Sequence, residues 1–282
     1  MDKLPQHKAS LFSDFGVYLR RINSSQSNHV PITYAHQDDY YIFGLVENGE
    51  GCGIIDFKEQ YFAPGDVFLI QPGQVHRFVS SENVEGWALM IDNSFVDSAD
   101  KCIFDNFSLF ASSFRMDEQR RNELKQILSL LAGRMDGITD KQTKATARRM
   151  AETFISIVAE AVHDINLQQT SHSRRHMEIV LSFRHLLAEH LATNRQPSYY
   201  ASRLNISTVY LNEVVKGVTG MNATLYIRNE VVLQAKRLLV HTDLAVKEIA
   251  DRLGIGDYAY FSRLFTLATG ISPTRFRERN LE

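Results

Sequence analysis

The sequence is poor in cysteine, and its two thiols, Cys52 and Cys102, lie far apart in the chain. This scarcity argues against a disulfide framework and against a thiolate metal cluster, and it favours a reducing compartment. No apolar run approaches the roughly 18 residues that a membrane span needs. The first residues, MDKLPQHKAS, also lack the apolar stretch of a secretory signal peptide. We therefore expect a cytoplasmic protein without a membrane segment.

Net charge is also nearly absent, at −2 for 282 residues, but the charge is unevenly divided. Residues 174–282 carry 15 Lys and Arg against 10 Asp and Glu, a net of +5, whereas residues 1–173 carry 16 against 23, a net of −7. A basic part beside an acidic one suggests that the last third faces a polyanion. Chance variation among solvated faces gives a similar asymmetry, so the charge supports nucleic-acid binding without establishing it.

The first part of the chain, about residues 10–92, is predicted to form a small β-barrel or sandwich. Short apolar stretches are separated there by turn-like segments, and this alternation favours a closed all-β unit. The predicted strands are 16–22, 40–46, 53–57, 67–70 and 86–91, and the predicted turns are 47–51, 62–66, 71–74 and 81–86.

Two amphipathic helices are expected next, within about residues 101–168, because apolar residues recur there at helical spacing. Such a pair offers an apolar surface to the barrel or to a second subunit. The residues expected to pack a dimer interface are Leu124, Leu128, Leu131, Phe154 and Val158.

A polar, aperiodic linker at 169–176 separates this first domain, 1–168, from a second domain, 177–282. The second domain shows no strand signals, and it contains an internal repeat. The matching residues are Ala201, Arg203, Leu204 and Ile206 in the first copy and Ala250, Arg252, Leu253 and Ile255 in the second, and both copies end on Thr-Gly.

Each copy predicts a helix, a tight turn and a second helix. Asn205 or Gly254 occupies the turn, where positive φ is tolerated, and Ser207 or Asp257 is placed to cap the second helix. This is the plan of a helix-turn-helix unit, expected at about 198–218 and again at 246–268, whose second helix enters a major groove. A single Ala–Leu–Gly turn occurs in many helix bundles, but two in the same order within a basic region favour DNA binding.

The segment EIADRLGIGDYAYFSRLFTLATGISPTRFR (248–277) resembles the signature of the AraC family of bacterial transcription regulators. The stretch PGDVFLIQPGQVHRF (64–78) resembles, less specifically, the cupin-like sensor domain of that family. The resemblance implies an α+β two-domain protein, in which a cupin-like β-barrel and a helical pair precede an all-α domain with two helix-turn-helix motifs. It also implies a homodimer that binds double-stranded promoter DNA, contacts RNA polymerase and responds to a small-molecule effector.

Outward-facing residues of the two second helices are the predicted DNA contacts: Ser207, Thr208, Val209, Asn212, Glu213, Lys216, Tyr258, Ala259, Ser262 and Arg263. Asn212 suits a bidentate bond to adenine, and Glu213 can accept from cytosine. Arg263 is the best single candidate for a base or phosphate contact, with a surface salt bridge as its alternative role. Family members usually carry basic residues where this chain has Thr266 and Leu267, which predicts modest non-specific affinity.

His76 in the stretch PGQVH invites a metal-site interpretation, because metal-dependent cupins use a histidine at the comparable place. Such sites need two or three further ligands, commonly a His-x-His pair. Only His36 lies upstream nearby, and the spacing of Asp38 or Asp39 is unconvincing. A structural histidine is therefore favoured over a ligand. Neither a metal nor another cofactor is predicted, and no catalytic residue set is found.

A sensor pocket inside the barrel is the preferred interpretation of the first domain. The candidate lining residues are Tyr41, Phe43, His76, Arg77 and Trp87. Because the strand register is unknown, each of them could equally face the core or the solvent. A cupin-fold enzyme and a ligand-independent DNA-binding protein are the two alternatives.

Overall fold

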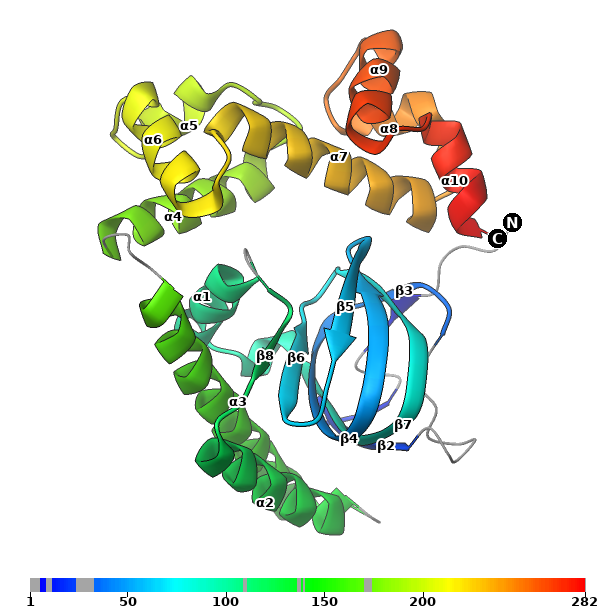
Figure 1. Ribbon diagram of the computed structural model, residues 1–282, viewed down its shortest axis with the longest axis vertical. Helices are drawn as coiled ribbons and strands as arrows, with labels where there is room; N and C mark the ends of the chain where they lie inside the picture. Colours follow the sequence, from blue (N-terminus) through cyan, green and yellow to red (C-terminus); the bar gives the residue numbers. More distant parts are fainter. Residues whose placement is uncertain are drawn as a thin grey trace. The chain divides into compact units, whose positions relative to one another are not determined.

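The computed structural model describes residues 6–8, 12–23, 33–108, 111–135, 138, 140–169 and 174–281 (Figure 1). Internal contacts divide this part of the chain into two compact units, 6–169 and 174–281. The first unit combines strands with helices and the second is helical, which confirms the predicted α+β two-domain fold. No helix among the described residues is long and apolar enough to cross a membrane.

The strands of the first unit form one curled sheet that wraps around a common interior (Figure 1). They follow the order β1-β3-β7-β4-β6-β8, with β2 beside β7 and β5 beside β4. The pairing of β1 with β3 is parallel and the other pairs are antiparallel. The bounds are β1 (Gln6–His7), β2 (Val17–Asn23), β3 (His36–Asp38), β4 (Tyr40–Ile55), β5 (Lys58–Phe62), β6 (Asp66–Ile70), β7 (Val75–Asp92) and β8 (Ser113–Arg115).

Strands β4 and β7 continue without interruption through two segments that the sequence predicts as turns, 47–51 and 81–86. The register of their pairing shifts at three places, as it does at β-bulges. Gly49 and Asn83 take positive φ values of 73° and 52° within these strands. The turn prediction was wrong here because residues suited to a turn instead let two long strands bend.

Alternate side chains of β4 enter two different cores. Tyr40 and Ile42 face the barrel interior, whereas Tyr41 and Phe43 face the helices. The ring centroid of Tyr41 lies 6.3 Å from that of Phe104 on helix α1 (Ser98–Phe107). One side of the sheet is therefore sealed by helices, and the other encloses a small interior.

Gly44 lets an aromatic ring lie across β4 inside the barrel. A Cβ atom at this position would come within 1.9 Å of the Phe68 ring, far inside van der Waals contact. Phe68 itself is 2% exposed and packs 4.8 Å, centroid to centroid, from Phe62. The ring thus fills interior space that the missing side chain leaves open.

Helices α2 (Glu118–Met135) and α3 (Lys141–Gln169) pack against each other and join the helix-facing core. A short 3-10 helix (Asn93–Phe95) precedes α1. The five residues expected at a dimer interface are at most 1% exposed within the single chain: Leu124, Leu128, Leu131, Phe154 and Val158. They belong to the core of the protomer, because a side chain already buried there has no surface to offer a second subunit.

Half of the predicted linker, residues 170–173, lies outside the described residues, and its other residues are helical, because α3 ends at Gln169 and the next helix begins at Arg174. Helix α7 of the second unit contacts α6, α8, α9 and α10, so it joins two helix pairs, α5–α6 and α8–α9. The bounds are α4 (Arg174–His190), α5 (Pro197–Arg203), α6 (Thr208–Thr219), α7 (Ala223–His241), α8 (Val246–Arg252), α9 (Tyr258–Thr269) and α10 (Pro273–Leu281).

Candidate functional site

The helix pairs α5–α6 and α8–α9 contain the same turn. Asn205 and Gly254 take positive φ values of 54° and 72° at equivalent places, as the sequence predicts. In both pairs the amide that follows this residue donates to a carbonyl oxygen of the first helix. The amide of Ile206 lies 3.0 Å from the oxygen of Ala201, and that of Ile255 lies 2.8 Å from the oxygen of Ala250. The internal repeat therefore corresponds to a repeated backbone geometry.

The second helices, α6 and α9, also begin and end alike. Ser207 caps α6 and Asp257 caps α9, each through a side-chain oxygen that accepts from backbone amides of the first turn. Gly220 and Gly270 follow the two helices in the left-handed conformation, with φ of 75° and 80°. Because each helix begins at its cap and ends at its glycine, both second helices have the same length.

Each second helix has one buried face and one exposed face. The buried faces consist mainly of Leu211, Val214 and Val215 on α6 and Phe261 and Phe265 on α9. Of the predicted DNA contacts, Ser207, Val209, Glu213, Lys216, Tyr258, Ala259 and Arg263 are exposed, and Thr208, Asn212 and Ser262 are half-buried. These exposed residues lie on the side of each helix that is free to contact a DNA groove.

Asn212 is occupied within the protein. Its Nδ2 donates to the carbonyl oxygen of Thr208 at 3.0 Å, and its Oδ1 accepts from the backbone amide of Ala223 at 3.1 Å. Each amide atom has one partner inside the protein, while Nδ2 keeps a second hydrogen and Oδ1 a second lone pair. Asn212 therefore links α6 to the start of α7, and its base contact stays a prediction.

Two exposed apolar residues on α9 were not among the predicted DNA contacts. Tyr260 is 49% exposed and Leu267 is 78% exposed. The repeat aligns Tyr260 with the half-buried Tyr210, which hid the difference between the two helices. The helical spacing of Tyr260 and Leu267, seven residues apart, places them on one side and could have revealed this apolar strip.

Arg195, which precedes α5, holds the turn between α8 and α9 against the first helix pair through two hydrogen bonds. Its Nη1 donates to the carbonyl oxygen of Leu253 at 2.6 Å, and its Nη2 donates to that of Gly254 at 2.7 Å. The turn packs so closely that a Cβ atom at Gly254 would lie 1.7 Å from the carbonyl oxygen of Ala192. These contacts and α7 hold the two helix pairs in one orientation.

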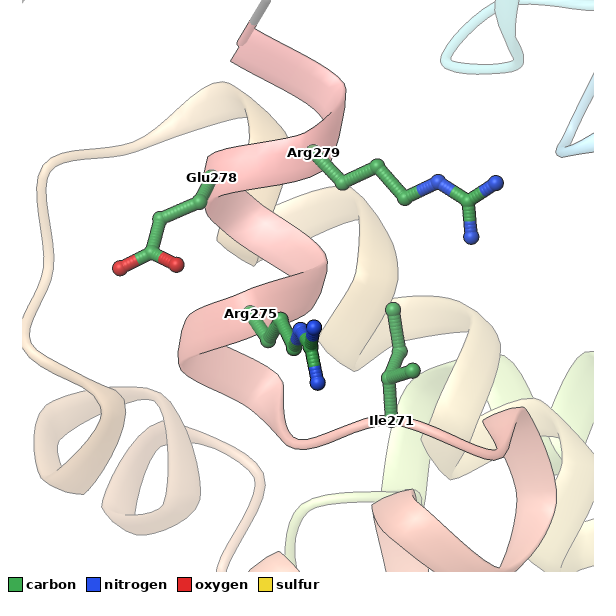
Figure 2. Close-up of a pocket in the computed structure, with 4 residues that line it drawn as sticks. All are labelled: Ile271, Arg275, Glu278 and Arg279. Atoms are coloured by element: carbon green, nitrogen blue, oxygen red, sulfur yellow. The ribbon is translucent and has the colours of Figure 1, made fainter.

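A hollow of about 460 Å³ lies beside α10. Figure 2 shows Arg275 next to Ile271, with Arg279 further along the same helix and Glu278 on another side of it. Three of these four side chains are exposed and their charges are mixed. The hollow therefore has no enclosed polar group, among the described residues that line it, to select a ligand.

The barrel interior of the first unit contains a cavity of about 40 Å³. Its lining residues are Arg20, Ile22, His36, Asp38, Tyr40, Ile42, Phe68, His76, Phe78, Ala88 and Met90. A cavity of this size holds one or two water molecules and is well below the volume of ordinary small-molecule pockets.

Of the five residues predicted to line a pocket, His76 alone is among those lining this cavity. Tyr41 and Phe43 point into the helix-facing core. Arg77 is exposed, and Trp87 packs on the helix side with the guanidinium of Arg21 4.7 Å from its ring. Side chains alternate along a strand, so choosing the neighbour of a lining residue reverses its direction.

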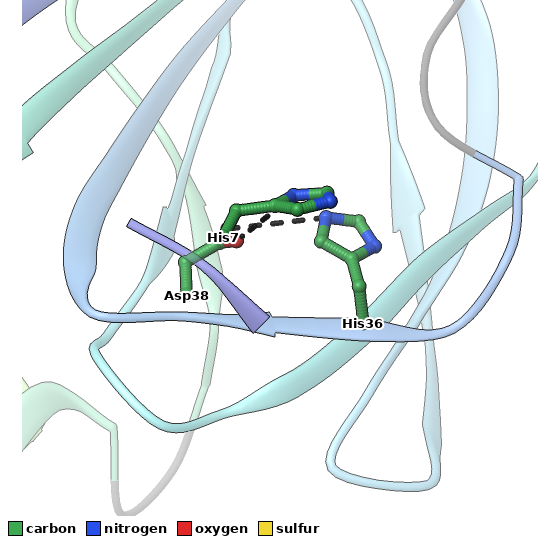
Figure 3. Close-up of side chains that lie close together, drawn as sticks. All are labelled: His7, His36 and Asp38. Carbon is green, nitrogen blue, oxygen red and sulfur yellow. Dashed lines mark ion pairs between the residues drawn. The ribbon is translucent and has the colours of Figure 1, made fainter. Parts of the chain in front are cut away.

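Three polar side chains that line the cavity, His36, Asp38 and His76, meet a fourth, His7, which contacts Asp38; we call these four the histidine–aspartate cluster (Figure 3 draws His7, His36 and Asp38). Nδ1 of His7 lies 3.3 Å from one Asp38 oxygen. The other oxygen lies 3.3 Å from Nε2 of His76 and 3.9 Å from Nε2 of His36. Sequence reasoning missed His7, because β1 is remote in the chain and only parallel pairing with β3 brings it here.

Burial governs the charge states in this cluster. It lowers the pKa of His36 to about 4 and that of His76 to about 3. It raises the pKa of Asp38 to about 7, against the opposing effect of the Tyr40 hydroxyl. The histidines are consequently neutral near pH 7, and each keeps one nitrogen lone pair.

Two family models match the chain, an AraC-like ligand binding domain over residues 17–158 and a helix-turn-helix domain over residues 200–279. The arabinose operon regulatory protein of Escherichia coli (strain K12) is 24% identical over 246 residues, which are 84% of this chain and 80% of that protein. The transcriptional activator RhaS of Escherichia fergusonii is 22% identical over 253 residues, 86% of this chain and 87% of its own.

Among solved structures, ToxT from Vibrio cholerae aligns with 93% of this chain and 98% of its own, at 13% identity and a TM-score of 0.46. The two family models cover most of both units described above, the barrel with its helices and the repeated helix pairs. The chain therefore belongs to the AraC family of transcription regulators, with an AraC-like ligand-binding domain followed by a helix-turn-helix DNA-binding domain.

Proposed function

We propose that the protein regulates promoters by placing α6 and α9 in two successive major grooves of its DNA site. The observation that carries this proposal is the repeated turn, cap and exposed face of the two helix pairs. The contacts of Arg195 and of α7 support a fixed spacing between the two helices. A rigid pair of this kind suits grooves that are about one DNA turn, ~34 Å, apart.

Charged side chains supply the strongest proposed contacts. Arg263 is exposed on α9 and has the fork of donors that matches guanine. Glu213 on α6 accepts from cytosine, and Lys216, one turn further on, neutralises a phosphate. These three side chains project from the faces that the core leaves open.

The remaining exposed positions supply apolar and hydroxyl contacts. Val209, Tyr258 and Ala259 present apolar surface of the kind that packs on thymine methyl groups. Hydroxyl groups of Thr208 and Ser262 are suited to sugar and phosphate oxygens. Ser207 already caps α6, so its proposed contribution is to position the first turn of the helix.

The test begins with recovery of bound fragments from genomic DNA, which yields a preferred duplex. Arg263→Ala is expected to weaken binding to that duplex about 10- to 100-fold, since a good bidentate base contact contributes roughly 1–3 kcal/mol of discrimination. Binding to a random duplex should change far less. Arg134→Ala, which removes an exposed arginine of the other unit, is the matched control and should bind as the parent protein does.

An equal loss on both duplexes would make Arg263 a phosphate contact only. Sequence-indifferent recovery of fragments would instead overturn specific regulation and favour an architectural DNA-binding protein.

We also propose a homodimer that forms through the exposed side of α2. Leu130 is 59% exposed there, on the side of the helix away from the buried Leu128. Leu130→Glu is expected to yield folded monomers in sedimentation, because it places charge in an apolar contact. Leu128→Glu should instead unfold the first unit. Unchanged sedimentation of a dimeric Leu130→Glu protein would move the interface elsewhere.

Control of transcription further requires an effector and RNA polymerase. We propose that an effector bound in the barrel shifts the population of conformations that occupy DNA. An effector of more than a few heavy atoms would have to displace Phe68, Phe78 or Met90 from the cavity. Transcription from the preferred promoter by purified RNA polymerase tests this role. We also propose that the protein is cytoplasmic and that it is not an enzyme.

A further inference from the structure

The histidine–aspartate cluster lies at a barrel cavity whose other lining residues are apolar apart from Arg20 and the hydroxyl of Tyr40. His36, Asp38 and His76 are each 2% exposed, and they are the buried polar residues of the part of the chain that the structure describes. We propose that the cluster binds one divalent transition-metal cation of the zinc type. This inference concerns the barrel only, and it holds whether or not the DNA contacts proposed above are right.

Two histidines are held with a lone pair facing the carboxylate. Nδ1 of His36 lies 3.0 Å from the carbonyl oxygen of Tyr34, and Nδ1 of His76 lies 3.2 Å from that of Gln74. A carbonyl oxygen only accepts, so the proton of each neutral imidazole is on Nδ1. Both Nε2 lone pairs then face an oxygen of Asp38, an arrangement that repels unless a positive charge lies between them.

The third histidine approaches Asp38 from another strand. Nε2 of His7 lies 3.1 Å from the hydroxyl of Tyr34, which can donate or accept, and Nδ1 of His7 lies 3.3 Å from the second oxygen of Asp38. Metal-binding histidines characteristically use the remote nitrogen in this way, since the outer hydrogen bond fixes the ring and its tautomer. All three imidazoles of the cluster therefore have an outer partner and an inner nitrogen that points at Asp38.

The separations within the cluster suit ligands of one ion better than hydrogen-bonded partners. Among the described residues, neither oxygen of Asp38 nor Nδ1 of His7 makes a hydrogen bond of good geometry, although the Tyr40 hydroxyl acts on Asp38 strongly enough to oppose the rise in its pKa. For metal–ligand bonds of about 2.1 Å, the ligand atoms of a tetrahedral site lie ~3.4 Å apart. Nδ1 of His7 lies 3.3 Å from one oxygen of Asp38, and the other oxygen lies 3.9 Å from Nε2 of His36 and 3.3 Å from Nε2 of His76. The ligand atoms of His7, His36 and Asp38 all lie within 4.8 Å of one another, so these three residues are the proposed ligands, and His76 contacts the carboxylate beside them.

A proton is a weaker explanation of the same geometry. A protonated Asp38 carries one hydrogen and can donate it to one nitrogen, whereas three nitrogens approach it. A dipositive ion between His7, His36 and Asp38 interacts with two lone pairs and with the carboxylate at once. Two imidazoles and one carboxylate, with a fourth position open to water, suit Zn²⁺ and its first-row neighbours, and they do not suit Mg²⁺ or Ca²⁺, which prefer oxygen ligands.

Bound metal would tie the first described strand to the barrel. Strand β1 consists of two residues, and its ladder partner is β3. The proposed ion adds a link from His7 to His36 and Asp38 on β3. Occupancy of the site would therefore slow exchange of the backbone amides of β1.

The test uses the full chain, stripped with a chelator and titrated with Zn²⁺ in a calorimeter. We expect one equivalent to bind per chain. His7→Ala and Asp38→Asn should each weaken binding by at least about 10-fold, since even outer partners of metal ligands change affinity by 10- to 100-fold. His163→Ala, which removes an exposed histidine of α3, is the matched control and should bind as the parent protein does.

Cobalt provides a readout that needs no variant. Co²⁺ bound by the stripped parent protein should give the intense visible absorption of a four-coordinate nitrogen and oxygen site, and Zn²⁺ should displace it. Absence of this absorption, or of stoichiometric Zn²⁺ binding, would overturn the proposal. The same conclusion would follow if the His7→Ala and Asp38→Asn proteins bound Zn²⁺ as tightly as the His163→Ala control.

Discussion

Replacing Gly254 by alanine tests whether the second turn is locked against the first helix pair. Gly254 has φ of 72°, a conformation that costs an L-residue roughly 1–2 kcal/mol. Its new Cβ would lie 1.7 Å from the carbonyl oxygen of Ala192 and 3.0 Å from Nη1 of Arg195. Relieving such overpacking costs a further 1–3 kcal/mol or so. We therefore expect Gly254→Ala to lower the free energy of unfolding by about 2–5 kcal/mol.

The matched control lies two residues away in the same turn. A methyl group added at Gly256 would meet no atom of the described residues within 4 Å, and the φ of Gly256 is outside the left-handed range. Gly256→Ala should therefore leave the protein unchanged or stabilise it by ~0.4–1 kcal/mol through the unfolded state. Urea unfolding followed by helical ellipticity measures both variants, with m compared to verify a common mechanism. Equal losses for Gly254→Ala and Gly256→Ala would refute the proposed close packing.

Two further substitutions test the links that position the recognition helices. Asn212→Ala should lower the unfolding free energy by about 1–3 kcal/mol, because it leaves the buried amide of Ala223 without its acceptor. In a binding titration the variant should lose affinity for the preferred duplex and for a random duplex to the same extent. Selective loss of affinity for the preferred duplex would support the base contact predicted for Asn212. Arg195→Ala should weaken binding to a two-groove site more than to a site shortened to one groove, because it frees the second turn; equal effects on both would contradict that role.

The second unit was predictable because its signals are local. The positive φ at Asn205 and Gly254 and the caps at Ser207 and Asp257 depend on residue types within a few positions of each other. The hydrogen bond from the amide of Ala223 to Asn212 was not predictable, because Ala223 belongs to the next helix. An outward helical position suggests a side chain without a partner in the protein, and here a tertiary contact supplies one.

The barrel was predictable in kind but not in register. Strands with a period of two predict a sheet, yet a one-residue error exchanges its faces. This is why Tyr41 and Phe43 were chosen for a cavity that Tyr40 and Ile42 line. The cluster around Asp38 was missed for a different reason. Its third histidine comes from a two-residue strand with no periodic signal at all.

Because Phe68 packs across Gly44, shortening this one side chain would open space inside the barrel. The ring occupies the interior next to the cavity, and the glycine beneath it cannot be replaced without removing the ring. Shortening Phe68 to alanine would leave an apolar vacancy of the type that accepts benzene-like guests in other protein cores. A regulator carrying that vacancy would be an entry point for synthetic inducers, chosen by shape to fit the truncated barrel and too large for the parent one.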